Sequence, residues 1–92
     1  MMVRIIAFGE MKTYLGVETI DVELKEGAIL ADLFSYIDTH LSSAMPAFLW
    51  NKQNQRFRGS VIILVDQCVA TDVATPLQDR QEIHLFMPMM GG

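Results

Sequence analysis

The sequence is poor in cysteine, has no run of basic residues and has no long uncharged hydrophobic stretch. Its one cysteine, Cys68, excludes an intramolecular disulfide and a CxxC metal or redox motif, and this usage is typical of a reducing compartment. Seven basic residues against eleven acidic ones give a net charge of −4. We therefore expect no nucleic acid and no anionic membrane as a partner, and favour a basic protein surface.

Signals for secretion and for a metal site are also missing. The hydrophobic stretch after Arg4 is broken by Glu10 and Lys12, so it is too short for a signal peptide, and no uncharged run approaches membrane-spanning length. His40 and His84 are not spaced as metal ligands, and no set of side chains suggests a catalytic centre. These absences predict a soluble, cytoplasmic protein.

The chain has enough apolar sequence for one modest core, because 51% of its 92 residues are hydrophobic. We expect a single domain over residues 1–92. Residues 3–8 are almost wholly apolar, which is typical of a strand in the middle of a sheet. Residues 19–25 alternate between apolar and polar and predict a half-buried strand that pairs with the first as a hairpin. Residues 9–16 suggest a connection with some local order.

A helical period begins after Gly27. It predicts a helix over residues 29–41, whose buried face consists of Leu30, Leu33, Phe34, Ile37 and Leu41. Ala28 occupies the expected N-cap position and cannot accept a hydrogen bond there, which costs about 1 kcal/mol. Asp32 offsets part of this cost through the helix dipole.

Residues 42–59 give the weakest pattern. Pro46 prevents a simple continuation of the helix. Residues 47–50 fit either a short strand or an apolar clamp over the core. Residues 51–55 predict a turn, which we expect to be the most mobile internal segment.

The last third of the chain supplies the remaining elements. In order, we expect a strand at 60–65, a turn at 66–67, a short strand at 68–70, one helical turn at 75–77, a turn at 79–81 and a last strand at 82–87. A helix that follows a hairpin packs on one face of a sheet, so this order predicts an α+β domain. We expect the β-grasp, or ubiquitin-like, architecture: a mixed sheet of about five strands with one main helix on one face.

The residues after the last strand suggest a flexible tail at 88–92. Gly91 and Gly92 lack a Cβ, so they adopt almost any backbone angle and fit a channel too narrow for a side chain. A flexible carboxylate without a side chain suits a group that reacts inside another protein's active site. We therefore interpret Gly92 as the reacting residue and Gly91 as the residue that permits threading.

Nearly the whole chain resembles the small subunit of molybdopterin synthase and the related thiamine-type sulfur carriers. The matching segments are 3–8, 14–16, 27–33, 65–67, 75–79, 82–88 and the Gly-Gly pair at 91–92. The last four segments follow the family's order near its spacing. The chain departs from the family at Ala28, at residues 79–81 and at 87–88, where a cap threonine, an Asp-Gly-Asp turn and a Pro-Pro pair are usual.

The resemblance implies a sulfur carrier that binds no cofactor and has no catalytic centre of its own, so that its standing as an enzyme is open. An adenylating enzyme related to ubiquitin-activating enzymes would use ATP to activate the carboxylate of Gly92. A sulfur donor would then displace AMP and leave a thiocarboxylate. The large synthase subunit would pass this sulfur to a pyranopterin precursor of the molybdenum or tungsten cofactor.

The resemblance also implies an apolar partner-binding surface. The family's contact positions correspond to Phe8, Val69 and Phe86, and we expect the surface to continue into the residues Met87, Pro88, Met89 and Met90. From the residues alone, Phe8 and Phe86 fit a core position about as well as an interface.

Three other functions stay open at this stage. The chain fits a carrier of the same fold for thiamine or another sulfur pathway, a ubiquitin-like modifier joined to lysines through Gly92, or a β-grasp adaptor with an inert tail. Arg56 and Arg58 fit a solvated loop better than a contact with an acidic partner.

Overall fold

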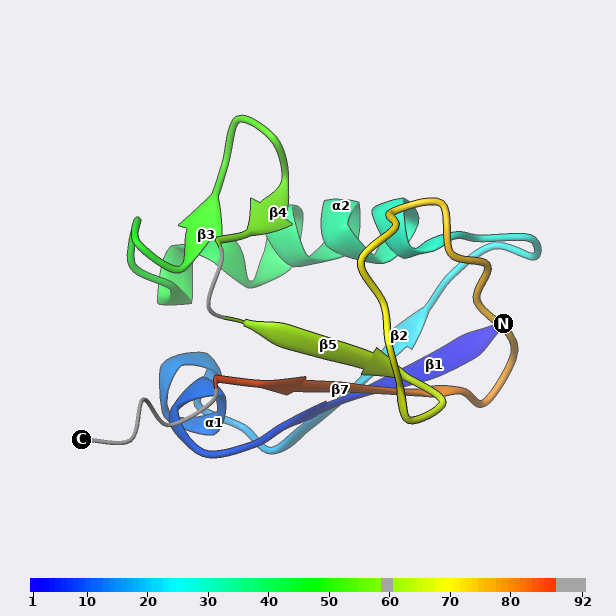
Figure 1. The fold of residues 1–92 in the computed structure, drawn as a ribbon, viewed down its shortest axis with the longest axis horizontal. Helices are drawn as coiled ribbons and strands as arrows, with labels where there is room; N and C mark the ends of the chain where they lie inside the picture. The colour runs from blue at the N-terminus through cyan, green and yellow to red at the C-terminus, as the bar shows by residue number, and fades with distance from the viewer. Residues whose placement is uncertain (59–60, 88–92) are drawn as a thin grey trace.

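The computed structural model describes residues 1–58 and 61–87. Its main element is a five-stranded mixed sheet in the order β2-β1-β7-β5-β6, and one longer helix, α2, lies along one face of it (Figure 1). The strands of this sheet are β1 (Met2–Ala7), β2 (Thr19–Glu23), β5 (Ile62–Val65), β6 (Cys68–Val69) and β7 (Glu82–Phe86). The predicted α+β architecture is confirmed. No helix of the described ranges is long and apolar enough to cross a membrane.

Strand β1 is an interior strand of the sheet, with a neighbour on each side, as predicted. It pairs with β2 in antiparallel register and with β7 in parallel register. Val3 and Ile5 are fully buried beneath α2, whereas Ile6 points to the opposite face and is half-buried. Successive side chains of a strand alternate between faces, so the apolar run of β1 supplies both the core and the face that no helix covers.

Helix α2 (Leu30–His40) agrees with the predicted helix to within one residue at each end. Leu33 and Ile37 of this helix are fully buried. The N-cap is Ile29 rather than Ala28, which is itself buried. The backbone N–H of Ile29 donates a hydrogen bond to Oδ2 of Asp32 at 2.8 Å, so Asp32 supplies half of a capping box.

Residues 9–16, which we expected to form a connection, contain a second short helix, α1 (Glu10–Leu15). Met11 enters the core, with Tyr14 and Leu15 packed beside it. The helix ends at Gly16, whose φ of 78° is left-handed and whose N–H donates to the carbonyl oxygen of Lys12 at 2.9 Å. Six residues are too few for a helical period to emerge from the sequence.

The segment after α2 forms a 3-10 turn, η1 (Ser42–Ala44), and a separate two-stranded sheet, β3 (Trp50–Asn51) and β4 (Arg56–Phe57). This β3–β4 hairpin lies against α2, on the helix side of the main sheet (Figure 1). Leu49 and Trp50 are buried, so residues 47–50 combine the two alternatives, the start of a strand and an apolar clamp.

The predicted turn at residues 51–55 is confirmed. Oδ1 of Asn51 accepts hydrogen bonds from the N–H groups of Gln53 and Asn54, at 3.0 and 3.2 Å. The high mobility of this segment stays a prediction.

The tight turn between β5 and β6 is also confirmed. Asp66 and Gln67 have φ values of 51° and 66°, as a type I′ turn requires, although neither residue is glycine. These left-handed angles are accessible to L residues at a cost of about 1–2 kcal/mol each.

The predicted helical turn at residues 75–77 is wrong. The N–H of Leu77 donates to the carbonyl oxygen of Ala28 at 3.0 Å, and the N–H of Leu30 donates to the carbonyl oxygen of Thr75 at 2.9 Å. Pro76 forms an antiparallel bridge with Ile29. The segment is therefore extended along the entry to α2, where the fixed φ of proline is tolerated and tertiary pairing outweighs the local Thr-Pro signal.

Candidate functional site

The face of the main sheet away from α2 carries a row of side chains that crosses four strands. Ile6 of β1 is paired with His84 of β7, His84 with Leu64 of β5, and Leu64 with Val69 of β6. Ile62 is paired with Phe86 beside this row. Directly opposed residues on one face lie in contact distance, so the register joins these side chains into one surface.

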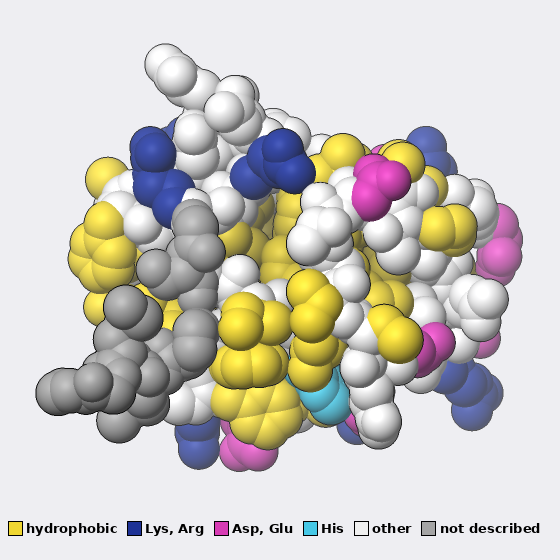
Figure 2. All heavy atoms as spheres, in the orientation of Figure 1, with side chains coloured by type: hydrophobic (Ala, Val, Ile, Leu, Met, Phe, Trp, Pro, Cys, Tyr) yellow, Lys and Arg dark blue, Asp and Glu magenta, His cyan; other side chains and the backbone are white. Residues whose placement is uncertain are grey.

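We call this surface the open-face patch. It consists of Ile6, Phe8, Ile62, Leu64, Val69, His84 and Phe86. Phe8 and Val69 are the most exposed members, with 45% and 65% of their surface accessible, and the others are half-buried. Figure 2 shows hydrophobic side chains gathered beside a histidine along the lower part of the molecule. A contiguous apolar patch on a small domain marks an interaction site.

His84 lies at the centre of the open-face patch. Its ring and the ring of Phe8 are T-shaped with centroids 5.3 Å apart, and its Nε2 lies 3.4 Å from Oε1 of Glu82. Only 22% of the His84 side chain is exposed. The ring therefore fills the space between Phe8 and the charged neighbour Glu82 and continues the apolar surface.

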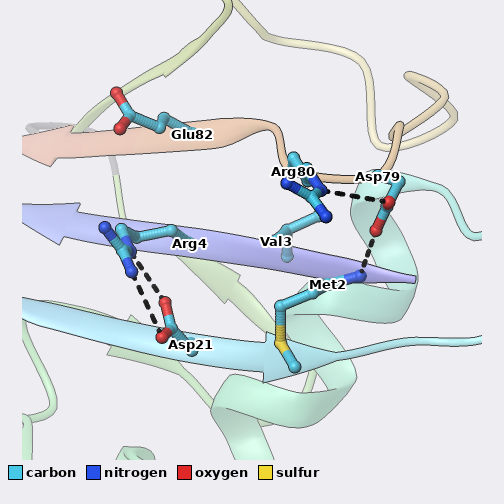
Figure 3. Close-up of a pocket in the computed structure, with 7 residues that line it drawn as sticks. All are labelled: Met2, Val3, Arg4, Asp21, Asp79, Arg80 and Glu82. Carbon is cyan, nitrogen blue, oxygen red and sulfur yellow. Dashed lines mark hydrogen bonds and ion pairs between the residues drawn. The ribbon is translucent and has the colours of Figure 1, made fainter.

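The other end of the same sheet face is charged. Nε of Arg4 donates to Oδ1 of Asp21 at 2.8 Å, and this hydrogen bond lowers the pKa of Asp21 and raises the pKa of Arg4 (Figure 3). Both side chains are about half exposed, so their ion pair adds little to stability. The pair borders a recess of about 450 Å³ that is lined by Met2, Val3, Arg4, Asp21, Asp79, Arg80 and Glu82. The open face is thus divided into an apolar half and a charged half.

The structure brings together three of the predicted contact residues, Phe8, Val69 and Phe86. Met87 is only partly exposed and packs against the core, because it lies on the helix-facing side in the alternation of β7. Its role as a contact residue stays a prediction. The predicted residues Pro88, Met89, Met90, Gly91 and Gly92 lie outside the described residues.

Sequence reasoning missed four members of the patch, Ile6, Ile62, Leu64 and His84. The alternation within β5 and β7 contains the signal, since the buried residues Ile63 and Val65 leave Ile62 and Leu64 on the opposite face. Which of these side chains stand together depends on strand register, which a single strand does not encode.

Metal ligands are not grouped in the part of the chain that the structure describes: no three His, Cys, Asp or Glu residues lie close enough together to hold an ion. Cys68 is exposed in β6 beside Val69. The described side chains offer an apolar docking surface in the open-face patch.

Comparison with models of protein families and with curated proteins found no match. Solved structures do match over essentially the full chain. SAMP1 of Haloferax volcanii has a TM-score of 0.81 at 17% identity, with all of both chains covered. Urm1 of Trypanosoma brucei has a TM-score of 0.76 at 16% identity, with 99% of this chain and 95% of that chain covered.

A third similar structure is a complex of subunits 1 and 2 of molybdopterin-converting factor from Helicobacter pylori. The matching chain has a TM-score of 0.67 at 22% identity, with all of both chains covered. The chain has the ubiquitin-like β-grasp fold. The family suspected from the sequence fits these neighbours, and the β-grasp sheet provides the open face on which the apolar patch lies.

Proposed function

We propose that this chain is a sulfur-carrier protein and the small subunit of molybdopterin synthase. The observation that carries the proposal is the open-face patch. It contains Phe8, Val69 and Phe86, and Phe86 belongs to β7, the strand that precedes residues 88–92 in the sequence. The similarity to a chain from a complex of subunits 1 and 2 of molybdopterin-converting factor supports a large-subunit partner.

Gly92 is the reacting residue in this proposal. A separate adenylating enzyme transfers AMP from ATP to the Gly92 carboxylate and releases pyrophosphate. A sulfide-level sulfur donor (HS⁻ or its equivalent) then attacks the acyl carbon, AMP leaves with the C–O electron pair, and loss of the proton from sulfur gives the thiocarboxylate. A carboxylate is a poor electrophile before its oxygen becomes part of a good leaving group, so activation comes first.

In this proposal the chain is the substrate of the adenylating enzyme, and its folded domain supplies the surface that each partner binds. It binds no cofactor, because ATP is used by the activating partner, and the groups that position the precursor belong to the large subunit. Gly91 lets the tail enter a narrow channel. The open-face patch, extended by Met87, Pro88, Met89 and Met90, orients the carrier on each partner in turn. We place this activity in the cytoplasm, with residues 1–92 acting as one sulfur-carrier domain.

Reconstitution tests the proposed pathway. Thiocarboxylated carrier, the large synthase subunit and the pyranopterin precursor are mixed, and dithiolene formation is followed. We expect product only with the thiocarboxylated chain. A carrier that accepts sulfur but neither binds the large subunit nor yields product would instead belong to a thiamine or other sulfur pathway.

A second function, a ubiquitin-like modifier, is supported by the similarity to the small archaeal modifier protein 1 of Haloferax volcanii. This function uses the same activation of Gly92 and ends in an isopeptide bond to a lysine of a target protein. Adducts of the chain with lysine-containing peptides, identified by mass spectrometry after expression in cells, would support it.

A further inference from the structure

The β3–β4 hairpin is the basic part of an acidic protein. Residues 51–58 contain Lys52, Arg56 and Arg58 and no acidic residue, which gives a charge of +3 in a chain whose net charge is −4. Among the described residues, none of these three cations belongs to an ion pair. Asp38, the acidic side chain at the hairpin, instead accepts hydrogen bonds from the neutral groups of Trp50 and Gln55.

The hairpin is anchored to α2 by aromatic packing and hydrogen bonds. Trp50 and Phe57 contact each other with ring centroids 4.9 Å apart, and both contact Phe34 of α2 at 6.0 Å. Nε1 of Trp50 donates to Asp38 at 2.8 Å, and Nε of Arg58 donates to the carbonyl oxygen of Ala47 at 2.8 Å. The basic side chains therefore stand on an anchored strand rather than on a free loop.

Within residues 1–58 and 61–87, no strand pairs with the edge of β4 that faces away from β3, and we call this the free edge. In the antiparallel pair, the N–H of Arg58 bonds to the carbonyl oxygen of Leu49, so the alternating pattern leaves the backbone N–H and C=O of Phe57 directed away from β3. Arg56 and Arg58 share one side of this strand, and Phe57 points to the other side, toward α2. An unpaired edge of this kind can accept an added strand.

A small open cleft adjoins this edge, with apolar and polar surface in about equal parts. It has a volume of about 190 Å³. The side chains of Leu30, Phe34, Phe57, Ile63 and Ala70 form its apolar part, and Arg56, Arg58 and Thr71 form its polar border. A space of this volume accommodates one small apolar group. Figure 2 shows basic side chains above a hollow with hydrophobic side chains at its floor, in the region where Figure 1 places β4 beside the chain that follows β6.

We propose that the β3–β4 hairpin is a second docking surface, which binds an extended acidic segment of a partner protein with one apolar anchor. The segment adds as a strand along β4 and bonds to the backbone of Phe57. Because side chains alternate, two acidic residues that flank the anchor meet Arg56 and Arg58, while the anchor enters the 190 Å³ cleft. A segment with the pattern acidic–apolar–acidic thus matches the two arginines, the free edge of β4 and the cleft beside it.

This surface lies on the helix side of the sheet, opposite the open-face patch. A protein bound at the hairpin leaves the open-face patch free. Such a partner can stay attached while the tail is passed from one enzyme to another. The inference does not rest on the sulfur-carrier function, since its evidence comes from other residues.

Peptide titration tests the proposal. Capped pentapeptides of the form Thr-Glu-X-Glu-Thr, with X as Leu, Val, Phe or Ser, are added to the isotope-labelled full chain, and amide shifts are followed by NMR. We expect at least one apolar X to bind about tenfold more tightly than Ser, which corresponds to burial of one aliphatic side chain. Shifts should centre on β4 and residues 70–73.

Charge variants complete the test. The double variant R56Q/R58Q should weaken binding about fivefold, as expected for the loss of two exposed ion pairs. The control K25Q/R80Q removes the same charge from exposed positions elsewhere and should bind normally. The proposal is overturned if no apolar peptide binds more tightly than the Ser peptide, or if the amide shifts centre on the open-face patch. It is also overturned if both double variants bind the peptide with equal affinity, or if a single-stranded oligonucleotide binds the hairpin more tightly than every peptide.

Discussion

The ring of Phe8 stands edge-on to the ring of His84, with centroids 5.3 Å apart. Phe8 follows β1, and His84 lies in the neighbouring parallel strand β7. The contact joins these two neighbouring strands on the open face and leaves 45% of the Phe8 surface accessible. A ring that is fixed by a neighbour and still exposed loses little conformational entropy when a partner covers it, which is the property of an interface anchor.

Replacing Phe8 by Ser should weaken binding of the large synthase subunit about tenfold or more without unfolding the domain, because the side chain is an exposed anchor. Val17→Ser is the matched control, since Val17 is also 45% exposed but lies outside the open-face patch. Calorimetric titration measures both. Equal affinities of the two variants for the large subunit would show that Phe8 is not an interface anchor.

The ion pair of Arg4 and Asp21 predicts a pH effect of known sign. The hydrogen bond from Arg4 lowers the pKa of Asp21 in the folded state. Its contribution to stability is therefore present above the ordinary pKa of an aspartate and is lost as the pH falls through the lowered folded value. Asp21→Asn should be slightly less stable than the wild type near neutral pH and equally stable in strong acid.

Chemical unfolding at a series of pH values measures this difference. Glu23→Gln is the control, because Glu23 is exposed two residues along the same strand and has no ion pair within the described residues. A difference that persisted unchanged into strong acid would contradict an origin in the Arg4–Asp21 pair.

The start of α2 depends on one side chain. Asp32→Ala removes the acceptor for the N–H of Ile29 and should lower the free energy of unfolding by about 1 kcal/mol. Asp32→Asn keeps an oxygen acceptor and should lose less. Denaturant midpoints compare the two variants, and an equal loss would assign the effect to charge rather than to the hydrogen bond.

The β5–β6 turn holds strain that glycine would relieve. Gln67 has a φ of 66° and is exposed, so Gln67→Gly should raise the free energy of unfolding by about 1 kcal/mol. Gln53 is exposed in the turn between β3 and β4 and is not among the positive-φ residues, so Gln53→Gly should only destabilise, through the unfolded state. Thermal unfolding distinguishes these outcomes, and a loss of stability at position 67 would contradict the strain argument.

Much of the fold was accessible from sequence where hydrophobic periodicity was long enough to read. The β1–β2 hairpin, α2 and β7 fall in this class, and even the turn at Asp66 and Gln67 was found without its glycine. Short-range signals failed where longer-range pairing decided the structure. Residues 75–77 have the local chemistry of a helix start, yet their backbone groups are used by the entry to α2.

The candidate site was accessible only in part. From the residues alone, Phe8 and Phe86 fitted a core position about as well as an interface, and only the family resemblance marked them as contact residues. The sequence did not show that Leu64 and His84 lie between Ile6 and Val69. That arrangement depends on the register of four strands, which tertiary packing sets. From the sequence, Arg56 and Arg58 looked like residues of a solvated loop. The packing of Trp50 on Phe34, which anchors their strand, joins segments far apart in the sequence, so local patterns do not show it.

The central claim is that the carboxylate of Gly92 is the group that receives sulfur. Intact-mass spectrometry tests it after the chain is incubated with ATP, a cognate adenylating enzyme and a sulfur source. We predict that the wild type gains the mass of one oxygen-to-sulfur exchange at its terminal residue, whereas a folded Gly91→Phe variant does not because its tail cannot thread. An unchanged mass for the wild type, or an exchange in the variant at the wild-type rate, would contradict the account.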